Sequence, residues 1–85
     1  MVNINGNGYV RVEIKYNNAK VAIAEFKGLV KLAEDYDALS IPKSVGSGIL
    51  NFKFDRDSRM AATDFYRDAL DRFHFNAGDI VPHPY

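Results

Sequence analysis

Two short stretches of the chain carry residues that could bind a phosphate or a cation. Gly46-Ser47-Gly48 has the glycine content of a phosphate-binding loop, and Asp55-Arg56-Asp57 has the aspartate spacing that opens a calcium-binding loop. The glycines, however, precede a predicted strand instead of joining a strand to a helix, and no Gly-Lys-Ser/Thr follows them. Met60 stands where a calcium loop needs glycine. We therefore interpret the glycines as a flexible loop and the aspartates as helix caps.

The histidines and serines form no catalytic or metal-binding pattern in the sequence. His74 and His83 are the only histidines, and their separation, with Asp79 between them, is not the short spacing of a metal site. No serine or threonine has a recognisable base as a partner, and the acidic cluster at 34–37 is expected to be solvated at a helix end. The sequence therefore predicts a protein that is not an enzyme and that holds no metal and no cofactor.

Length and composition limit the class of protein. The 85 residues fit one domain, 1–85, and with 47% apolar residues the chain is expected to fold rather than to be disordered. Eleven basic residues balance eleven acidic ones, which argues against a dedicated nucleic-acid binder. The chain has no cysteine and no apolar run long enough for a membrane span. We expect a soluble, cytoplasmic protein that does not bind membranes.

The clearest secondary-structure pattern is an amphipathic helix over Asp57–His74. Its apolar residues recur at helical spacing on one side, and its charged residues fall on the other. Asp55, Asp57 and Ser58 are candidate caps for its first turn. The aspartates of this segment are thus explained by structure, and its apolar stripe predicts a surface that packs on a sheet.

The segment after the first strand has two interpretations. Tyr9–Tyr16 alternates between apolar and polar residues and is predicted as a strand. If Asn17-Asn18 forms a two-residue turn, Ala19–Phe26 is the returning strand of a hairpin, which we favour because Val21 and Ile23 are β-branched. In the alternative, the next helix extends back to Ala19, but this would put Glu25 inside its buried stripe.

The rest of the chain completes a small α+β domain. Lys27–Leu39 is predicted as a helix, Lys43–Gly48 as a loop, and Ile49–Phe54 as a strand that could join the sheet in parallel. Ile80-Val81 could add a short edge strand, but the prolines that follow favour an extended C-terminal tail over 75–85. The predicted order is β-β-α-β-α, or β-α-β-α in the alternative, with both helices on one face of a short sheet.

One face of the predicted sheet is left uncovered and carries mixed aromatic and basic groups. The residues that we expect to bind a partner are Tyr9, Arg11, Lys15, Phe26 and Lys53. Aromatic and arginine side chains are frequent anchors of protein interfaces. The same mixture also suits single-stranded nucleic acid, through stacking and phosphate contacts, so nucleic acid is the alternative partner.

These expectations describe a small protein-binding module that acts without catalysis. It would be an inhibitor or adaptor that occupies a partner's surface, and such proteins include accessory proteins of phages and mobile elements. Because a sheet of so few strands has edges to protect, we also weigh a homodimer. Neither the identity of the partner nor the strand order follows from the sequence.

Overall fold

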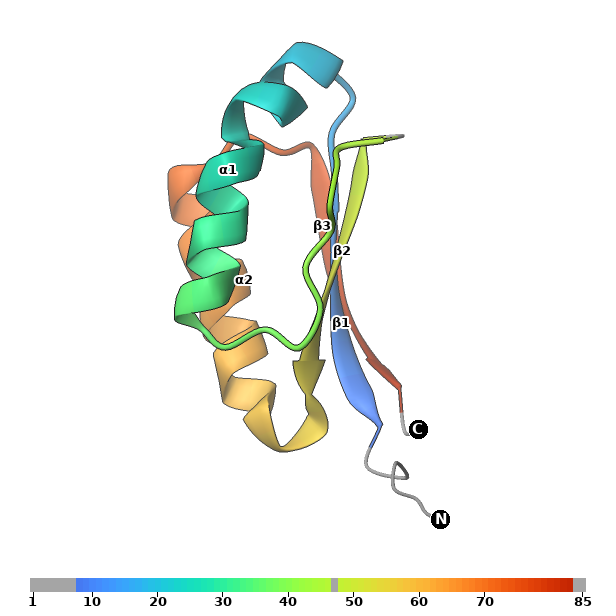
Figure 1. The fold of residues 1–85 in the computed structure, drawn as a ribbon, viewed down its shortest axis with the longest axis vertical. Coiled ribbons are helices and arrows are strands. Elements are labelled where there is room, and N and C mark those ends of the chain that lie inside the picture. The colour runs from blue at the N-terminus through green and yellow to red at the C-terminus, as the bar shows by residue number, and fades with distance from the viewer. Residues whose placement is uncertain (1–7, 47, 84–85) are drawn as a thin grey trace.

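A computed structural model of the chain describes residues 8–46 and 48–83, which form three strands and two helices. Figure 1 shows two layers, with both helices on one side of a single sheet. The elements, in chain order, are β1 (Tyr9–Lys15), α1 (Ala19–Asp35), β2 (Ile49–Asp55), a single 3-10 turn (Arg56–Ser58), α2 (Arg59–Arg72) and β3 (Ala77–His83). The fold is thus α+β, as predicted, with the order β-α-β-α-β.

The sheet is antiparallel throughout and has the strand order β2-β1-β3. β1 is the central strand, and its middle residue, Val12, pairs with Phe52 of β2 and with Ile80 of β3. The segment between α1 and β2 runs back along the length of the helix before β2 begins (Figure 1). This return is why β2 enters antiparallel to β1, instead of in the parallel arrangement that a helical crossover would permit.

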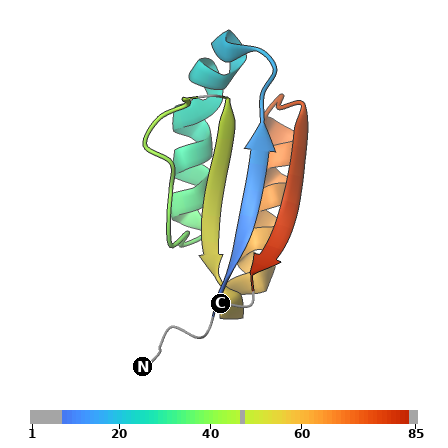
Figure 2. The same cartoon turned by 90° about the vertical axis from the view of Figure 1, so that its right-hand side faces the viewer.

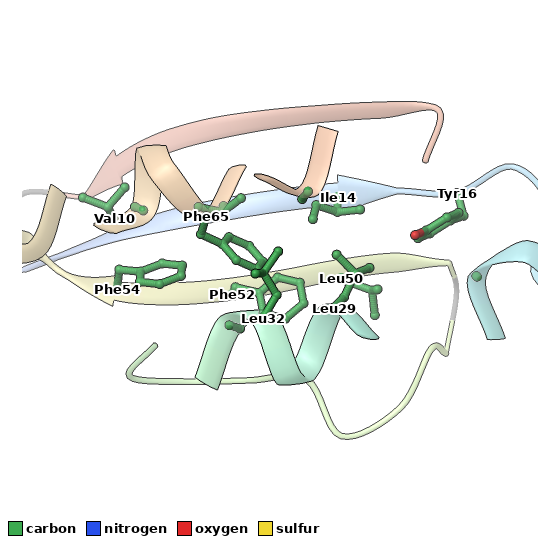
Figure 3. Packing of buried hydrophobic residues seen from close by; sticks show 14 residues of the cluster. Val10, Ile14, Tyr16, Leu29, Leu32, Leu50, Phe52, Phe54 and Phe65 are labelled. Carbon is green, nitrogen blue, oxygen red and sulfur yellow. The ribbon is translucent and has the colours of Figure 1, made fainter. Parts of the chain in front are cut away.

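The hydrophobic core fills the space between the sheet and the helices. Phe65 of α2 packs against two sheet aromatics, with ring centroids 5.0 Å from Phe52 and 5.3 Å from Phe54. Leu29 and Leu32 close the same cluster from α1 (Figure 3). All five side chains are buried, and the alternation of β1 and β2 therefore has one fully apolar side.

The predicted hairpin at Asn17-Asn18 is wrong, and the alternative helix from Ala19 is correct. Asn18 is the N-cap of α1, and its side-chain oxygen accepts hydrogen bonds from the backbone N–H groups of Lys20 and Val21. The β-branched residues at 21 and 23 lower helix propensity only slightly. The cap and the burial of Ala22, Leu29 and Leu32 stabilise the helix by more than this loss. α1 ends at Asp35, four residues before the predicted end.

The predicted C-terminal tail is largely a strand. Residues 77–83 form β3, which pairs with β1 along its whole length, so the short edge strand weighed at Ile80-Val81 exists and is longer. Pro82 is tolerated there because β3 is an edge strand and a missing N–H on its outer side breaks no ladder bond. Tyr85, the last residue of the predicted tail, lies outside the described residues.

Gly48 is the one glycine of the 43–48 loop that the packing requires. Its φ is +87°, and a Cβ at this position would lie 2.9 Å from the backbone oxygen of Tyr16. The residue also accepts a hydrogen bond from the Tyr16 N–H at 2.8 Å, which extends the β1–β2 ladder by one pair. The predicted loop is therefore a tight entry into β2.

Asn18→Ala is expected to lower the free energy of unfolding by about 1 kcal/mol, because two N–H groups of the first turn lose their acceptor. Chemical denaturation measures the change. Asn17→Ala is the matched control, since Asn17 contributes its backbone N–H to Asn76 and this bond survives the substitution. Equal losses for the two variants would contradict the assignment of Asn18 as the cap.

Candidate functional site

The sheet has one face that neither helix covers. Figure 2 looks onto this face, with the three strands in front and both helices behind them. The side chains that alternate with the buried positions belong to it, and we call this set the open face. Its described side chains are Tyr9, Arg11, Glu13 and Lys15 of β1, Ile49, Asn51, Lys53 and Asp55 of β2, and Ala77, Asp79 and Val81 of β3.

Four of the five predicted partner-binding residues lie together on the open face. Arg11 and Lys53 are direct cross-strand partners, and the Lys53 ammonium lies 4.7 Å from the centroid of the Tyr9 ring. Lys15 is at the far end of β1 and forms a 3.7 Å ion pair with Glu13. These residues come from two strands that are far apart in sequence, and the sheet brings them together.

Phe26 is the predicted residue that the structure places elsewhere. It lies in α1, on the other side of the sheet, and packs partly buried against the core. Its assignment to the open face depended on the hairpin, and it fails for the same reason. Lys20, which shared that face in the predicted register, lies in the first turn of α1.

The charges of the open face are arranged in rows of like sign across the strands. Arg11 is directly opposite Lys53, and Glu13 is directly opposite Asp79. Like charges in cross-strand pairs destabilise a sheet, whereas opposite charges would stabilise it. Because the two rows are adjacent, exchanging Arg11 with Glu13 would have produced favourable pairs. The observed arrangement is therefore unfavourable for the isolated sheet.

Arg11 also has an unmet hydrogen-bonding requirement. Its Nε is covered by surrounding atoms and has no acceptor among the described residues. A covered donor without an acceptor carries a desolvation penalty that water does not relieve. The outer nitrogens of a guanidinium can still form charge-assisted bonds to a carboxylate that approaches from outside the sheet. Arg11 can therefore still bind an acidic partner through its outer nitrogens, although its Nε stays covered.

Each edge of the sheet has features that hinder the addition of a further strand. On the β3 edge, the N–H of Ile80 is bound at 2.9 Å by the side chain of the preceding residue, Asp79, and Pro82 has no N–H. On the β2 edge, Lys53 exchanges backbone hydrogen bonds with Leu39 and Ser40, at distances from 2.7 to 3.2 Å. Such features suppress strand addition. The accessible binding surface of the sheet is therefore its face.

Behind the sheet, Glu25 joins three elements through one carboxylate. The Tyr16 hydroxyl at the end of β1 donates to Glu25 Oε1 at 2.7 Å, and the His74 N–H, just after α2, donates to the same atom at 2.8 Å. Glu25 Oε2 lies 2.7 Å from the Nδ1 of the His74 ring. We call these three residues the Glu25 node.

The hydrogen bonds of the node shift the pKa values of its members. Burial acts to raise the pKa of Glu25, but the bonds from the His74 backbone and ring and from Tyr16 outweigh it, so the pKa lies below its ordinary value. Burial, and then the Glu25 carboxylate, raise the pKa of the Tyr16 hydroxyl. Both groups are therefore held in their ordinary ionisation states at neutral pH, and the node acts as a structural link between α1, α2 and β1.

The sequence does not predict the Glu25 node, although a carboxylate inside the apolar stripe of a helix indicates that it needs partners. In the sequence, Glu25 counts against the helix because a carboxylate in a buried stripe is costly. The cost is offset by donors that lie 9 and 49 residues away, in Tyr16 and His74. A second link of the same kind joins the helices where the Tyr36 hydroxyl donates to Asp68 of α2, and this bond raises the pKa of Tyr36.

Asp55, His74 and Asp79, whose types suit ligand binding, have structural partners. The Asp55 carboxylate accepts the N–H of Asp57 at 2.9 Å, which supports its interpretation as a cap at the entry to α2. His74 is bound to Glu25, and Asp79 to the Ile80 N–H. Among the residues that the structure describes, no cluster of three His, Asp or Glu side chains has the arrangement of a metal site.

A hollow of about 430 Å³ lies between the start of α1 and the end of the loop before β2. Its lining has no charged side chain and consists of Tyr16, Asn17, Ala19, Ile23, Val45, Gly46 and Gly48. Ile23 is 65% exposed there, which is high for a large apolar residue on a helix. The hollow offers an apolar contact, and the hydroxyl of its one ionisable side chain, Tyr16, is bound to Glu25.

No protein-family model matches the chain, and no curated protein or solved structure matches it either. Within the part of the chain that the structure describes, neither helix has the length and apolar character needed to cross a membrane. A functional proposal for this α+β domain consequently depends on the chemistry of its own surfaces.

Glu25→Gln is expected to lower the free energy of unfolding by about 1–3 kcal/mol at neutral pH, because charge-assisted bonds to Tyr16 and His74 are weakened. Since the folded-state pKa of Glu25 is depressed, the unfolded chain takes up the proton first. The contribution is complete above the ordinary value of 4.5 and is lost as the pH falls below it.

The measurement is denaturant unfolding of both proteins from neutral to acidic pH. The difference in stability between wild type and Glu25→Gln should shrink below pH 4.5. Tyr16→Phe is the matched control: it removes one donor, at a loss of about 1 kcal/mol, but leaves the carboxylate and the His74 bonds in place. A pH-independent difference for Glu25→Gln would show that its charge does not stabilise the fold.

Proposed function

We propose that the chain is a non-catalytic protein-binding module that acts as an inhibitor or an adaptor. Its open face occupies a surface of a partner protein and excludes whatever that surface would otherwise bind. Tyr9, Arg11, Lys15 and Lys53 are the anchors. Aromatic and arginine side chains that lie at the centre of a contact carry most of the binding energy of protein interfaces.

The observation that carries this proposal is the charge arrangement of the uncovered face. Arg11 faces Lys53 and Glu13 faces Asp79, although the opposite assignment would stabilise the sheet. Proteins tolerate such local losses where a surface serves a function. A partner with complementary charges would offset both like-charge pairs and could bind the outer nitrogens of the Arg11 guanidinium.

Nucleic acid is the second candidate partner, because Tyr9, Arg11 and Lys53 combine an aromatic ring with basic groups. The face, however, also carries Glu13, Asp55 and Asp79, whose carboxylates repel phosphates. Phosphate contacts make affinity fall steeply with salt concentration. A contact to protein that is centred on Tyr9 and on complementary charge rows should change much less.

A role as a cytoplasmic accessory protein of a phage or mobile element fits this activity. It is supported by the small size of the domain, the absence of cysteine and the lack of a catalytic constellation in the sequence.

Replacing Tyr9, Arg11 and Lys53 together by alanine is expected to abolish capture of the partner. The measurement is an affinity pull-down with mass spectrometry from the native host, with nuclease treatment in a parallel sample. The matched control replaces Lys27, Lys31 and Arg67, three exposed residues of the helical layer, by alanine. It removes three positive charges, one more than the open-face variant, and should leave capture intact.

Partner capture that survives the triple substitution on the open face would refute the assignment of this surface. Loss of capture after nuclease treatment, together with an affinity that falls by orders of magnitude as salt is raised, would instead favour nucleic acid. Circular dichroism of each variant shows whether the fold is retained, since the three open-face residues lie outside the core.

A further inference from the structure

The open face has a symmetry that follows from the register of the sheet. All three strands have seven residues, and their middle residues, Val12, Phe52 and Ile80, form one row across the sheet. A line along this row divides the face into equal halves. We take an axis that is parallel to this line and lies just outside the open face. A rotation of 180° about this axis generates a second copy whose open face lies against the first, and the two faces overlap completely.

The same rotation brings opposite charges together on the central strand. Positions equally far from Val12 exchange places, so Arg11 of one copy meets Glu13 of the other, and Glu13 meets Arg11. Tyr9 meets Lys15 in the same way, a pairing that suits a cation over an aromatic ring. Strands of the two sheets run antiparallel in this arrangement, within the range of aligned sheet packing. The outward sequence Tyr9-Arg11-Glu13-Lys15 is thus complementary to its own reverse.

We propose that a second copy of this chain is an occupant of the open face, in a two-fold dimer centred on Val12. This inference rests on the proposed function, because it takes the open face to be a protein-binding surface. In the dimer Arg11 lies over Glu13 of the other copy, while Lys53 lies over Asn51 and Asp79 lies over Val81. The Arg11 guanidinium gains a carboxylate on the side away from the sheet. The dimer therefore offsets each like-charge pair at its member on the central strand, Arg11 in one pair and Glu13 in the other.

The area of the contact between the two copies limits the affinity of the dimer. Three strands of seven residues span about 14 by 24 Å. This area is small beside the roughly 800 Å² per partner of a stable complex. The dimer is consequently weak and forms as the concentration rises. Because it uses the surface that binds the partner, self-association and partner binding exclude each other.

The experiment uses two charge-reversal variants. Each alone should self-associate poorly, whereas an equimolar mixture of the two should form a dimer. Arg11→Glu gives a copy with two acidic residues at positions 11 and 13, and Glu13→Arg gives a copy with two basic ones. Each variant should show self-association at least tenfold weaker than wild type, because both symmetry-related pairs become repulsive. An equimolar mixture should form a mixed dimer, since every charge at the two positions then meets its opposite. Sedimentation velocity at micromolar and near-millimolar concentration measures all four samples.

The same variants also control for an effect of the substitutions on folding. Arg11→Glu creates an attractive pair with Lys53, and Glu13→Arg creates one with Asp79. Glu13→Arg also removes the ion pair with Lys15, but that pair is partly exposed and weak, so neither reversal should markedly reduce the stability of the single chain. A wild type that remains monomeric at near-millimolar concentration would overturn the dimer. So would single variants that associate as well as wild type, or a mixture that remains monomeric.

The outcome separates this inference from the proposed function. If wild type is monomeric but the triple alanine variant loses partner capture, the dimer fails and the binding module stands. If wild type dimerises through the open face but the triple variant still captures the partner, the dimer stands and the partner binds elsewhere.

Discussion

The position of β1 at the centre of the sheet is the constraint on which the structure depends. β1 is paired along both edges, with β2 on one side and β3 on the other, and each pair is in full register. Its apolar side, Val10, Val12 and Ile14, forms the floor of the core on which Phe65 and both helices pack. Its polar side holds the centre of the open face. One alternating heptapeptide thus determines where the core lies and which surface remains accessible.

Periodicity in the sequence was enough to predict β1, β2, α2 and the two-layer α+β arrangement, because each of those segments has one unambiguous apolar side. It was not enough at Ala19–Phe26, where the β-branched residues at 21 and 23 favoured a strand and Glu25 counted against a helix. The contacts that stabilise Glu25 come from Tyr16 and His74, and such distant partners are not visible in a local pattern. The full length of β3 does not follow from the sequence, because Pro82 is compatible with a strand only on an outer edge and the sequence does not show the strand order.

The residues of the candidate site are likewise predicted only in part by the sequence. Tyr9, Arg11, Lys15 and Lys53 could be grouped from strand alternation alone, since they follow directly from the apolar positions. Phe26 could not be excluded, because its place depended on the one element that was predicted wrongly. The rows of like charge depended on the cross-strand register, which pairs β1 with segments about 40 and 70 residues away. Their functional meaning therefore became apparent only once the strand order was known.

The order of the strands has a consequence for how the protein folds. The central strand is synthesised before both of its neighbours, and one of these, β3, is the last of the described elements. While α1 and β2 emerge, one edge of β1 has no partner, and the pairing that completes the sheet must close a loop of about 60 residues. Contacts so distant in sequence slow folding. The sheet is thus complete only after synthesis has passed β3, and a stall before that point would leave β1 exposed to strand exchange with other nascent chains.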